Sequence, residues 1–179
     1  MHPRIAELIE YIDNQTAGLR AAYQSVPREQ RAVRPAPDRW SPAEVVHHVV
    51  IVERRLALRL ATLIEQARTL PPESDSTATF PSAVANRVEN RDQRFRTSEA
   101  GEPHNTDPGR VWDDLAEARQ DLKQVIATGD GLQLGAVSAP HPALGQFTAY
   151  EWIAFAGAHA ARHADQIREM AVSAKAASV

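Results

Sequence analysis

Apolar residues recur at intervals of three, four and seven along most of the chain, the spacing that places side chains on one face of an α-helix. Four long segments show this spacing, and stretches rich in proline, glycine and small polar residues separate them. The predicted helices cover about 3–25, 42–70, 109–128 and 148–174. Four amphipathic helices predict an all-α protein, and specifically a four-helix bundle.

The start of the second helix carries the clearest local signal. Ser41 suits the N-cap, Pro42 suits the first helical position, and Glu44 stands three residues after the serine. A serine and a glutamate at this spacing form a capping box, in which each side chain bonds the other residue's backbone amide. The pattern therefore predicts that a helix begins directly after Ser41.

Two long connections join these helices. Residues 71–108 are rich in turn-forming residues, with one short helical candidate over 83–95. Connections of this length are commonly functional, so we expect this one to pass over one end of the domain as a lid. Residues 129–146 are predicted to form a second loop. Such long connections indicate that the bundle is not a simple up-down-up-down arrangement.

Composition narrows the class of protein. The 179 residues fit one domain, 1–179, and the net charge of −3 without any lysine or arginine block gives no reason to expect a nucleic-acid partner. Cysteine is absent, which excludes a disulfide framework and a cysteine nucleophile. No stretch approaches the roughly 18 apolar residues of a membrane span, and the N-terminus lacks a signal-peptide core. We expect a cytoplasmic protein without a membrane partner.

Two histidines four residues apart, His159 and His163, stand in the apolar run "WIAFAGAHAARHADQI". At about 100° per residue, their side chains lie about 40° apart on one helix face. Trp152, Phe155 and Met170 share that face, so both imidazoles are predicted to point into the bundle. A buried imidazole needs a partner for each nitrogen. The pair is therefore either a satisfied part of the core or two ligands of one metal ion.

A third ligand would come from a facing helix, and the second helix offers His47 and His48. Its apolar stripe comprises Val45, Val49, Val52, Leu56 and Leu63. His48 lies about 70° from the centre of this stripe, whereas His47 lies nearly opposite it. The geometry therefore selects His48 as the third ligand, and His47 is expected to face solvent or a loop.

Other metal-binding motifs are excluded because the sequence lacks residues that they require. The stretch "HAARH" has no glutamate beside its first histidine, so it does not match the H-E-x-x-H zinc proteases. Glu44 and His47 form a Glu-x-x-His motif, but no second copy occurs, and carboxylate di-iron bundles need two.

Three features together resemble the DinB/YfiT-like superfamily of metal-dependent enzymes. They are "DRWSPAEVVHHVVIVERR", "APHPALGQFTAYEWIAFAGAHAARHADQI" and the order of the helices. The family pattern has a Trp-Ser/Thr opening to the second helix, a histidine eight residues after that tryptophan, and H-x-x-x-H on the last helix. Here the residue eight after Trp40 is His48, the one selected from the helix geometry. The similarity spans nearly the whole chain.

The resemblance implies an up-down-down-up four-helix bundle with a divalent metal, zinc, nickel or manganese, on His48, His159 and His163. Known members include S-transferases that use bacillithiol or mycothiol and a mycothiol-dependent maleylpyruvate isomerase. The expected function is therefore a metal-dependent transferase that acts on a small molecule with such a thiol as co-substrate. A metal-dependent hydrolase and a non-catalytic metal-binding or ligand-binding bundle stay open as alternatives, because fold does not settle chemistry. A homodimer is also compatible with what the resemblance implies.

Four further residues are candidates for supporting roles. His141, in "HPALG" before the last helix, is expected to support the site rather than to provide a fourth ligand. Arg55, Arg59 and Arg162 are candidate anchors for an anionic substrate at the edge of the cavity. Surface ion pairs are the alternative for each of the three arginines.

Overall fold

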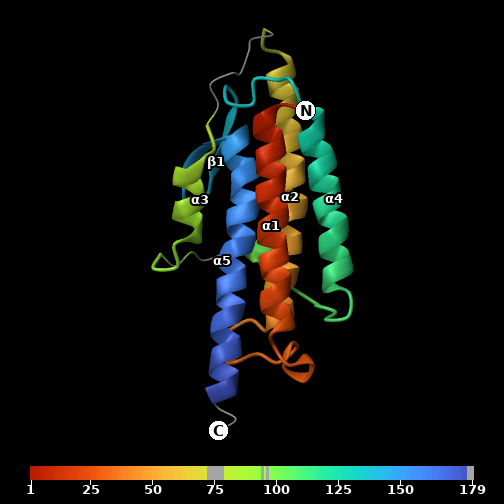
Figure 1. Cartoon of the computed structure of the whole chain (residues 1–179), viewed down its shortest axis with the longest axis vertical. Coiled ribbons are helices and arrows are strands. Elements are labelled where there is room, and N and C mark those ends of the chain that lie inside the picture. Colours follow the sequence, from red (N-terminus) through yellow and green to blue (C-terminus); the bar gives the residue numbers. More distant parts are fainter. Residues whose placement is uncertain (72–78, 94, 96, 177–179) are drawn as a thin grey trace.

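A computed structural model of the chain describes residues 1–71, 79–93, 95 and 97–176. Four long helices run along the molecule (Figure 1), which confirms the predicted helical class. They are α1 (Pro3–Gln24), α2 (Pro42–Arg68), α4 (Val111–Thr128) and α5 (Ala149–Ala176). The connections contain a short helix, α3 (Ser82–Glu89), two 3₁₀ turns (Arg28–Gln30 and Glu99–Gly101) and two strands, β1 (Ser138–His141) and β2 (Gly145–Thr148). None of the described helices is long and apolar enough to cross a membrane.

The long helices pack as two pairs. α1 packs mainly on α5, α2 packs mainly on α4, and α2 also contacts α5, whereas α1 and α4 scarcely touch (Figure 1). Contacts between helix ends show which ends lie together, within the α2–α4 pair and between the two pairs. Arg68 at the end of α2 donates to the carbonyl of Thr128 at the end of α4 at 3.0 Å. The amino group of Met1, before α1, lies 3.3 Å from Asp130, after α4.

The predicted capping box at the start of α2 is present. The Ser41 hydroxyl accepts from the Glu44 amide at 3.2 Å, and the Ser41 amide donates to the Glu44 carboxylate at 2.8 Å. Arg34 adds a second partner, because its Nε donates to the two Glu44 oxygens at 3.0 and 2.9 Å. This arrangement satisfies amides at the helix N-terminus and fixes where α2 begins.

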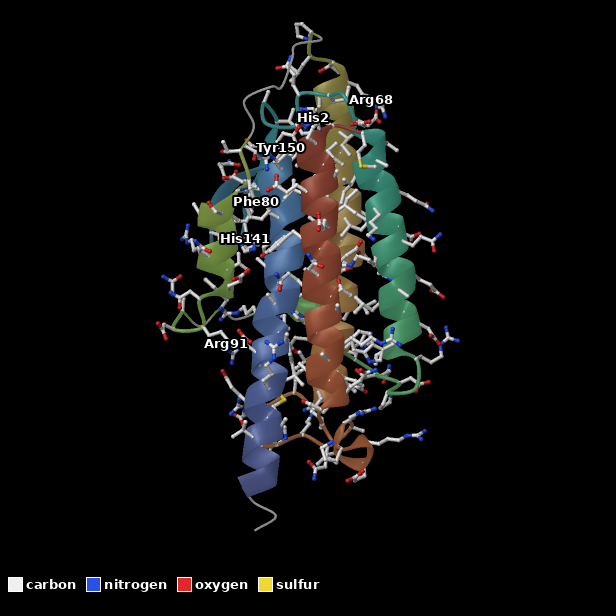
Figure 2. All side chains as sticks on the ribbon, in the orientation of Figure 1. His2, Arg68, Phe80, Arg91, His141 and Tyr150 are labelled. Carbon is white, nitrogen blue, oxygen red and sulfur yellow. The ribbon has the colours of Figure 1, made fainter. Side chains whose placement is uncertain are left out.

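The described helix of the connection over 71–108 lies beside the bundle, whereas a lid over one end was expected. This helix, α3, lies along the side of α5 (Figure 1), where Val84, Ala85 and Val88 are buried. Arg91, near the end of α3 (Figure 2), pairs with Glu169 of α5 through bonds of 2.9 and 2.6 Å. The apolar face of this short helix must pack against another apolar surface along the whole helix, and the side of α5 provides that surface.

Two predictions about the connections between the long helices were wrong. The helix expected over 83–95 ends at Glu89, because Asn90 leaves the helical conformation with ψ at 112°. Residues 72–78, 94 and 96 of the same connection lie outside the described part of the chain. The loop expected over 129–146 ends in an antiparallel hairpin, in which β1 and β2 pair Ala139 with Phe147. Gly145 opens β2 with φ at 89°, a conformation that glycine adopts readily.

α5 is buried on all sides over 152–160, so its neighbours must approach closely. Tyr11 of α1 lies directly over Gly157 of α5, where a methyl group would fall within 3.0 Å of two ring carbons. The ring cannot easily move, because its hydroxyl donates to Glu89 of α3 at 2.5 Å and its edge contacts Phe80 at a centroid distance of 5.1 Å. Tyr11 therefore ties α1, α3 and α5 together at this point.

Gly157→Ala is expected to lower the free energy of unfolding by about 1–3 kcal/mol, because the added methyl group overlaps a ring held on both sides. Gly18→Ala in α1 is the matched control, since its Cβ would meet only Arg168 at 3.7 Å. That change should raise stability by roughly 0.5–1 kcal/mol through helix propensity. Urea unfolding of both variants measures the effects, and equal stabilisation by both would contradict the close contact at Gly157.

Candidate metal centre

Three buried histidines meet between α2 and α5. His48 of α2 is 5% exposed, and His159 and His163 of α5 are 8% and 7% exposed. The Nε2 atom of His159 lies 3.2 Å from Nε2 of His48 and 3.1 Å from Nε2 of His163. One ring nitrogen from each residue therefore points at a common centre, and the three lie within 4.8 Å of one another. The structure brings together the three residues that the sequence selected.

The outer nitrogens of two of these rings have fixed partners. His48 Nδ1 lies 2.7 Å from the carbonyl oxygen of Gly101, and His163 Nδ1 lies 2.8 Å from Oε1 of Gln166. Both oxygens can only accept, so each Nδ1 carries the hydrogen. In a neutral imidazole the other nitrogen, Nε2, then presents a lone pair. This is the tautomer that outer hydrogen bonds impose on histidines that bind metals.

The three imidazoles are neutral at physiological pH. Burial lowers the pKa of His163 to about 3 and holds the pKa of His159 well below its usual value. Burial also lowers the pKa of His48, against the opposing effect of the Gly101 carbonyl. Since ligating histidines must be unprotonated, these shifts leave the residues in the form that binds a cation.

The inner face of the cluster fits a divalent ion. Two of the three facing nitrogens carry lone pairs, so one hydrogen on His159 could satisfy only one of them. An ion about 2.0–2.1 Å from each nitrogen in tetrahedral geometry would place the nitrogens about 3.3 Å apart. The observed 3.1 and 3.2 Å are close to that spacing. Three buried histidines arranged in this way fit a metal-binding site.

Aromatic rings support the imidazoles from outside. Phe155 stacks on His159 with ring centroids 5.2 Å apart, and Trp40 lies 4.8 Å from His48. His141 stands one ring further out, 5.1 Å from Phe155, and its Nδ1 accepts from the Ala143 amide at 3.2 Å. His141 is not part of the group of converging ligand nitrogens. Its supporting role stays a prediction.

The three candidate arginines occupy different surroundings. Arg162 donates to the carbonyls of Val88 at 3.1 Å and of Asn90 and Gln93 at 2.5 Å, so its guanidinium holds the segment after α3 against α5. Arg59 lies over the Trp152 ring at 4.8 Å.

Arg55 is exposed on α2. The role of the three arginines as anchors stays a prediction.

His47 behaves as the helix geometry suggested. Its side chain is only partly buried and its Nδ1 lies 2.8 Å from the hydroxyl of Thr106, in the connection before α4. The adjacent histidines of α2 therefore face different neighbours. His48 faces the cluster, whereas His47 faces a loop.

The sequence analysis missed the outer partners of the cluster. Gln166 follows His163 by three residues on one helix, so helical spacing could have identified it. Gly101 is 53 residues from His48 along the chain, and no local pattern connects them. A buried ion pair between Glu53 of α2 and Arg119 of α4 was also missed.

The lowered histidine pKa values predict a pH effect on the metal-free protein. The unfolded chain takes up a proton at His163 below a pH of about 6.5, whereas the folded chain does so only near 3. The contribution of His163 to stability is therefore present at pH 7 and is lost as the pH falls below 6.5. Between pH 7 and 5.5, wild type in chelator should lose about 1 kcal/mol more unfolding free energy than His163→Gln. Equal losses in urea titrations would contradict the buried neutral state.

Metal uptake should separate the two histidines of α2. We expect one zinc or nickel ion per chain in wild type and at least about tenfold weaker affinity in His48→Ala, because two imidazoles hold a divalent ion poorly. His47→Ala is the matched control and should keep wild-type affinity, since its side chain contacts Thr106. Elemental analysis and competition with a chromogenic chelator give both values. Equal loss in the two variants, or no uptake by wild type, would overturn the ligand assignment.

Comparison with known proteins agrees with this geometry. The family profile described as the DinB superfamily matches residues 3–167, which include all three histidines and the four long helices up to the last turns of α5. No curated protein and no solved structure shows a significant match to the chain. A match over most of the chain, together with the histidine cluster between α2 and α5, leads to one conclusion: the chain belongs to the DinB superfamily.

Proposed function

We propose that this protein is a metal-dependent transferase that joins a low-molecular-weight thiol to a small electrophilic substrate. His48, His159 and His163 would hold the divalent ion, with zinc or nickel expected and manganese as a further candidate. The observation that carries the proposal is the convergence of three Nε2 atoms while Gly101 and Gln166 engage the outer nitrogens. The up-down-down-up helix order is part of the proposal and is supported by the contacts between the ends of α1, α2 and α4.

The chemistry follows from the ligand set. A divalent ion on three neutral imidazoles retains its full charge and an open coordination position, and so lowers the pKa of a bound thiol or water. In the proposed reaction the thiol sulfur bonds to a carbon of an epoxide, the carbon–oxygen bond breaks, and the thiol proton ends on the released oxygen. The cysteine-free chain has no thiol of its own, so the sulfur nucleophile would come from a co-substrate such as bacillithiol or mycothiol.

The side chains around the cluster would orient the substrates. Phe155 and Trp152 are in edge-to-face contact at 5.6 Å and extend an apolar wall from His159 towards the hairpin. Arg59 lies at the far end of this wall over Trp152. We propose Arg59 as the anchor for an anionic end of the thiol, because Arg59 is exposed and donates to one backbone carbonyl, that of Pro140 at 3.4 Å, whereas Arg162 donates to three.

Hydrolysis is less well supported. The converging group contains three histidines and no carboxylate among the described residues, so it offers no general base beside the ion for activating water. A bundle that binds metal or a small ligand without turnover would contain the same cluster. The two alternatives differ from thiol transfer in measurable ways.

Metal-loaded protein is expected to accelerate conjugation of an epoxide with bacillithiol or mycothiol. His159→Ala should reduce the rate to that of the uncatalysed reaction, because it removes the central nitrogen of the cluster. His47→Ala is the control and should retain the wild-type rate. Product formation followed by mass spectrometry gives the rates with and without metal.

The same assay distinguishes the alternatives. Cleavage of ester or amide substrates by metal-loaded protein in the absence of any thiol would show that the protein is a hydrolase and not a transferase. Full metal occupancy without turnover of either substrate class would favour a non-catalytic bundle that binds metal or a small ligand. Either result contradicts the proposed function.

A further inference from the structure

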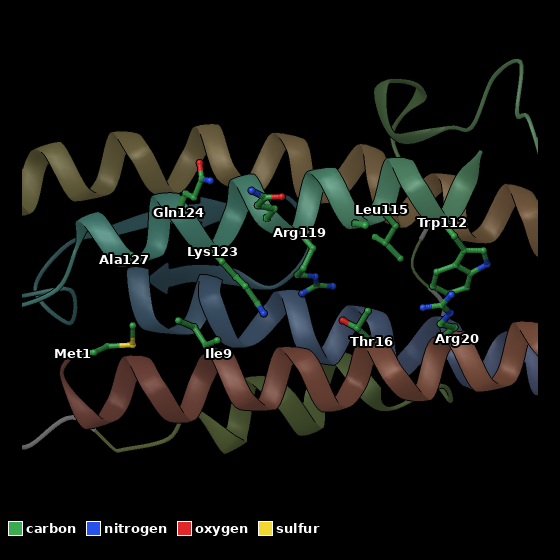
Figure 3. A pocket seen from close by; sticks show the side chains of 12 residues that line it. Met1, Ile9, Thr16, Arg20, Trp112, Leu115, Arg119, Lys123, Gln124 and Ala127 are labelled. Atoms are coloured by element: carbon green, nitrogen blue, oxygen red, sulfur yellow. The ribbon is translucent and has the colours of Figure 1, made fainter. Parts of the chain in front are cut away.

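A cavity lies between α1 and α4, and none of the three histidines lines it. Its volume is about 660 Å³, within the range of pockets that bind small molecules. Figure 3 shows this cavity with side chains from α1 below and α4 above. It exists because α1 packs on α5 and α4 packs on α2. The facing sides of α1 and α4 therefore scarcely touch.

The lining combines an apolar surface with positive charge. Ile9 of α1 and Leu115 of α4 contribute much of the apolar wall, and Ala116 and Ala127 leave space beside them. Among the described residues, the charged side chains that line the cavity are those of Arg20, Arg119 and Lys123, all cationic, and no aspartate or glutamate lines it. Such a surface favours a ligand with an apolar body and a negative end.

Arg119 supplies the most specific feature. This side chain is 6% exposed and extends from α4 into the space between the helices (Figure 3). Its Nη2 pairs with Oε1 of Glu53, which is 1% exposed. Among the described residues, Arg119 Nε and Nη1 have no hydrogen-bond partner, and neither does Glu53 Oε2. Buried donors without partners are costly, because they lose their bonds to water and gain none in return. The guanidinium therefore has unused donors covered by the side chains that line the cavity.

The charges around the cavity leave one positive charge unbalanced. Lys123 pairs with Asp13 at 2.5 Å, Arg119 pairs with Glu53, and Arg20 lies over the Trp112 ring at 5.7 Å. The amino group of Met1, which also lines the cavity, pairs with Asp130. Four cations and three carboxylates give a local excess of one positive charge. A ligand with a single carboxylate group would balance it, whereas a dianion would leave a negative charge in a mostly apolar cavity.

We infer that the cavity between α1 and α4 binds a small amphipathic carboxylate, such as a medium-chain fatty acid. The carboxylate accepts from Arg119 Nη1, and the apolar chain lies along Ile9 and Leu115. The two free nitrogens of Arg119 have almost no exposed surface, so side chains that line the cavity shift when the ligand enters. This site is separate from the histidine cluster and does not depend on the proposed transferase activity.

Calorimetric titration of the full-length protein with octanoate tests the inference, with 1-octanol as the uncharged probe. Wild type should bind one octanoate per chain, about tenfold or more tightly than octanol, which reflects one charge-assisted hydrogen bond. Ala116→Phe places a ring on an exposed cavity position and should abolish binding of both probes.

Arg119 is tested by removing both members of its ion pair, because single removal would leave an unpaired buried charge. In Glu53→Gln/Arg119→Met, octanoate affinity should fall about tenfold to the value for octanol, while octanol affinity stays the same. Circular dichroism and metal content should match wild type in both variants.

Three results would overturn the inference: no saturable octanoate binding to wild type, equal octanoate affinity in wild type and the double variant, or full binding in Ala116→Phe. A fourth is a dimer that Ala116→Phe dissociates without any octanoate binding to wild type, which would make the cavity an interface between two copies of the chain.

Discussion

The burial of three imidazoles at one point is the constraint on which the rest of the structure depends. Each ring has two nitrogens, and a buried nitrogen without a partner costs stability. His48 can face His159 only if α2 and α5 lie side by side at that level, with ring centroids 5.1 Å apart. The outer nitrogen of His48 then requires an acceptor, which Gly101 provides from the connection before α4. One cluster therefore fixes the relative positions of two helices and a loop.

The small residues of α5 make this arrangement possible. α5 is buried over 152–160, and alanines and one glycine alternate there with the large side chains. At Gly157 the ring of Tyr11 approaches the α5 backbone, while Phe155 and His159 point to other neighbours. A helix with large side chains on every face could not approach α1, α2 and α3 at once. The same feature lets α5 carry two histidines without opening a gap in the core.

Most of what was predicted correctly from the sequence depends on local spacing. The capping box at Ser41 and the i, i+4 pair on α5 involve residues within one or two helical turns, where backbone geometry dictates their relation. His48 required one further step, the comparison of its position with the apolar stripe of α2. The structure places His48 beside His159, because helix periodicity holds over the whole element, and its role as a ligand stays a prediction.

What could not be predicted involves contacts between distant segments. Gly101 lies 53 residues from His48, and Glu53 lies 66 residues from Arg119. The position of α3 on the side of α5 also depends on tertiary packing, since an eight-residue amphipathic helix can cover any matching apolar surface. The hairpin was missed because its strands have only four residues each and too little alternation to be distinguished from a loop.

The two buried polar clusters of the bundle call for opposite kinds of ligand. At the histidines, the donors are engaged outside by Gly101 and Gln166, and lone pairs meet inside, so the cluster has a surplus of acceptors. At Arg119, two guanidinium nitrogens are without a partner against one carboxylate oxygen of Glu53, so the surplus is of donors. A surplus of acceptors is satisfied by a cation and a surplus of donors by an anion. The hydrogen-bond inventory of each cluster thus indicates the charge of the ligand that would satisfy it.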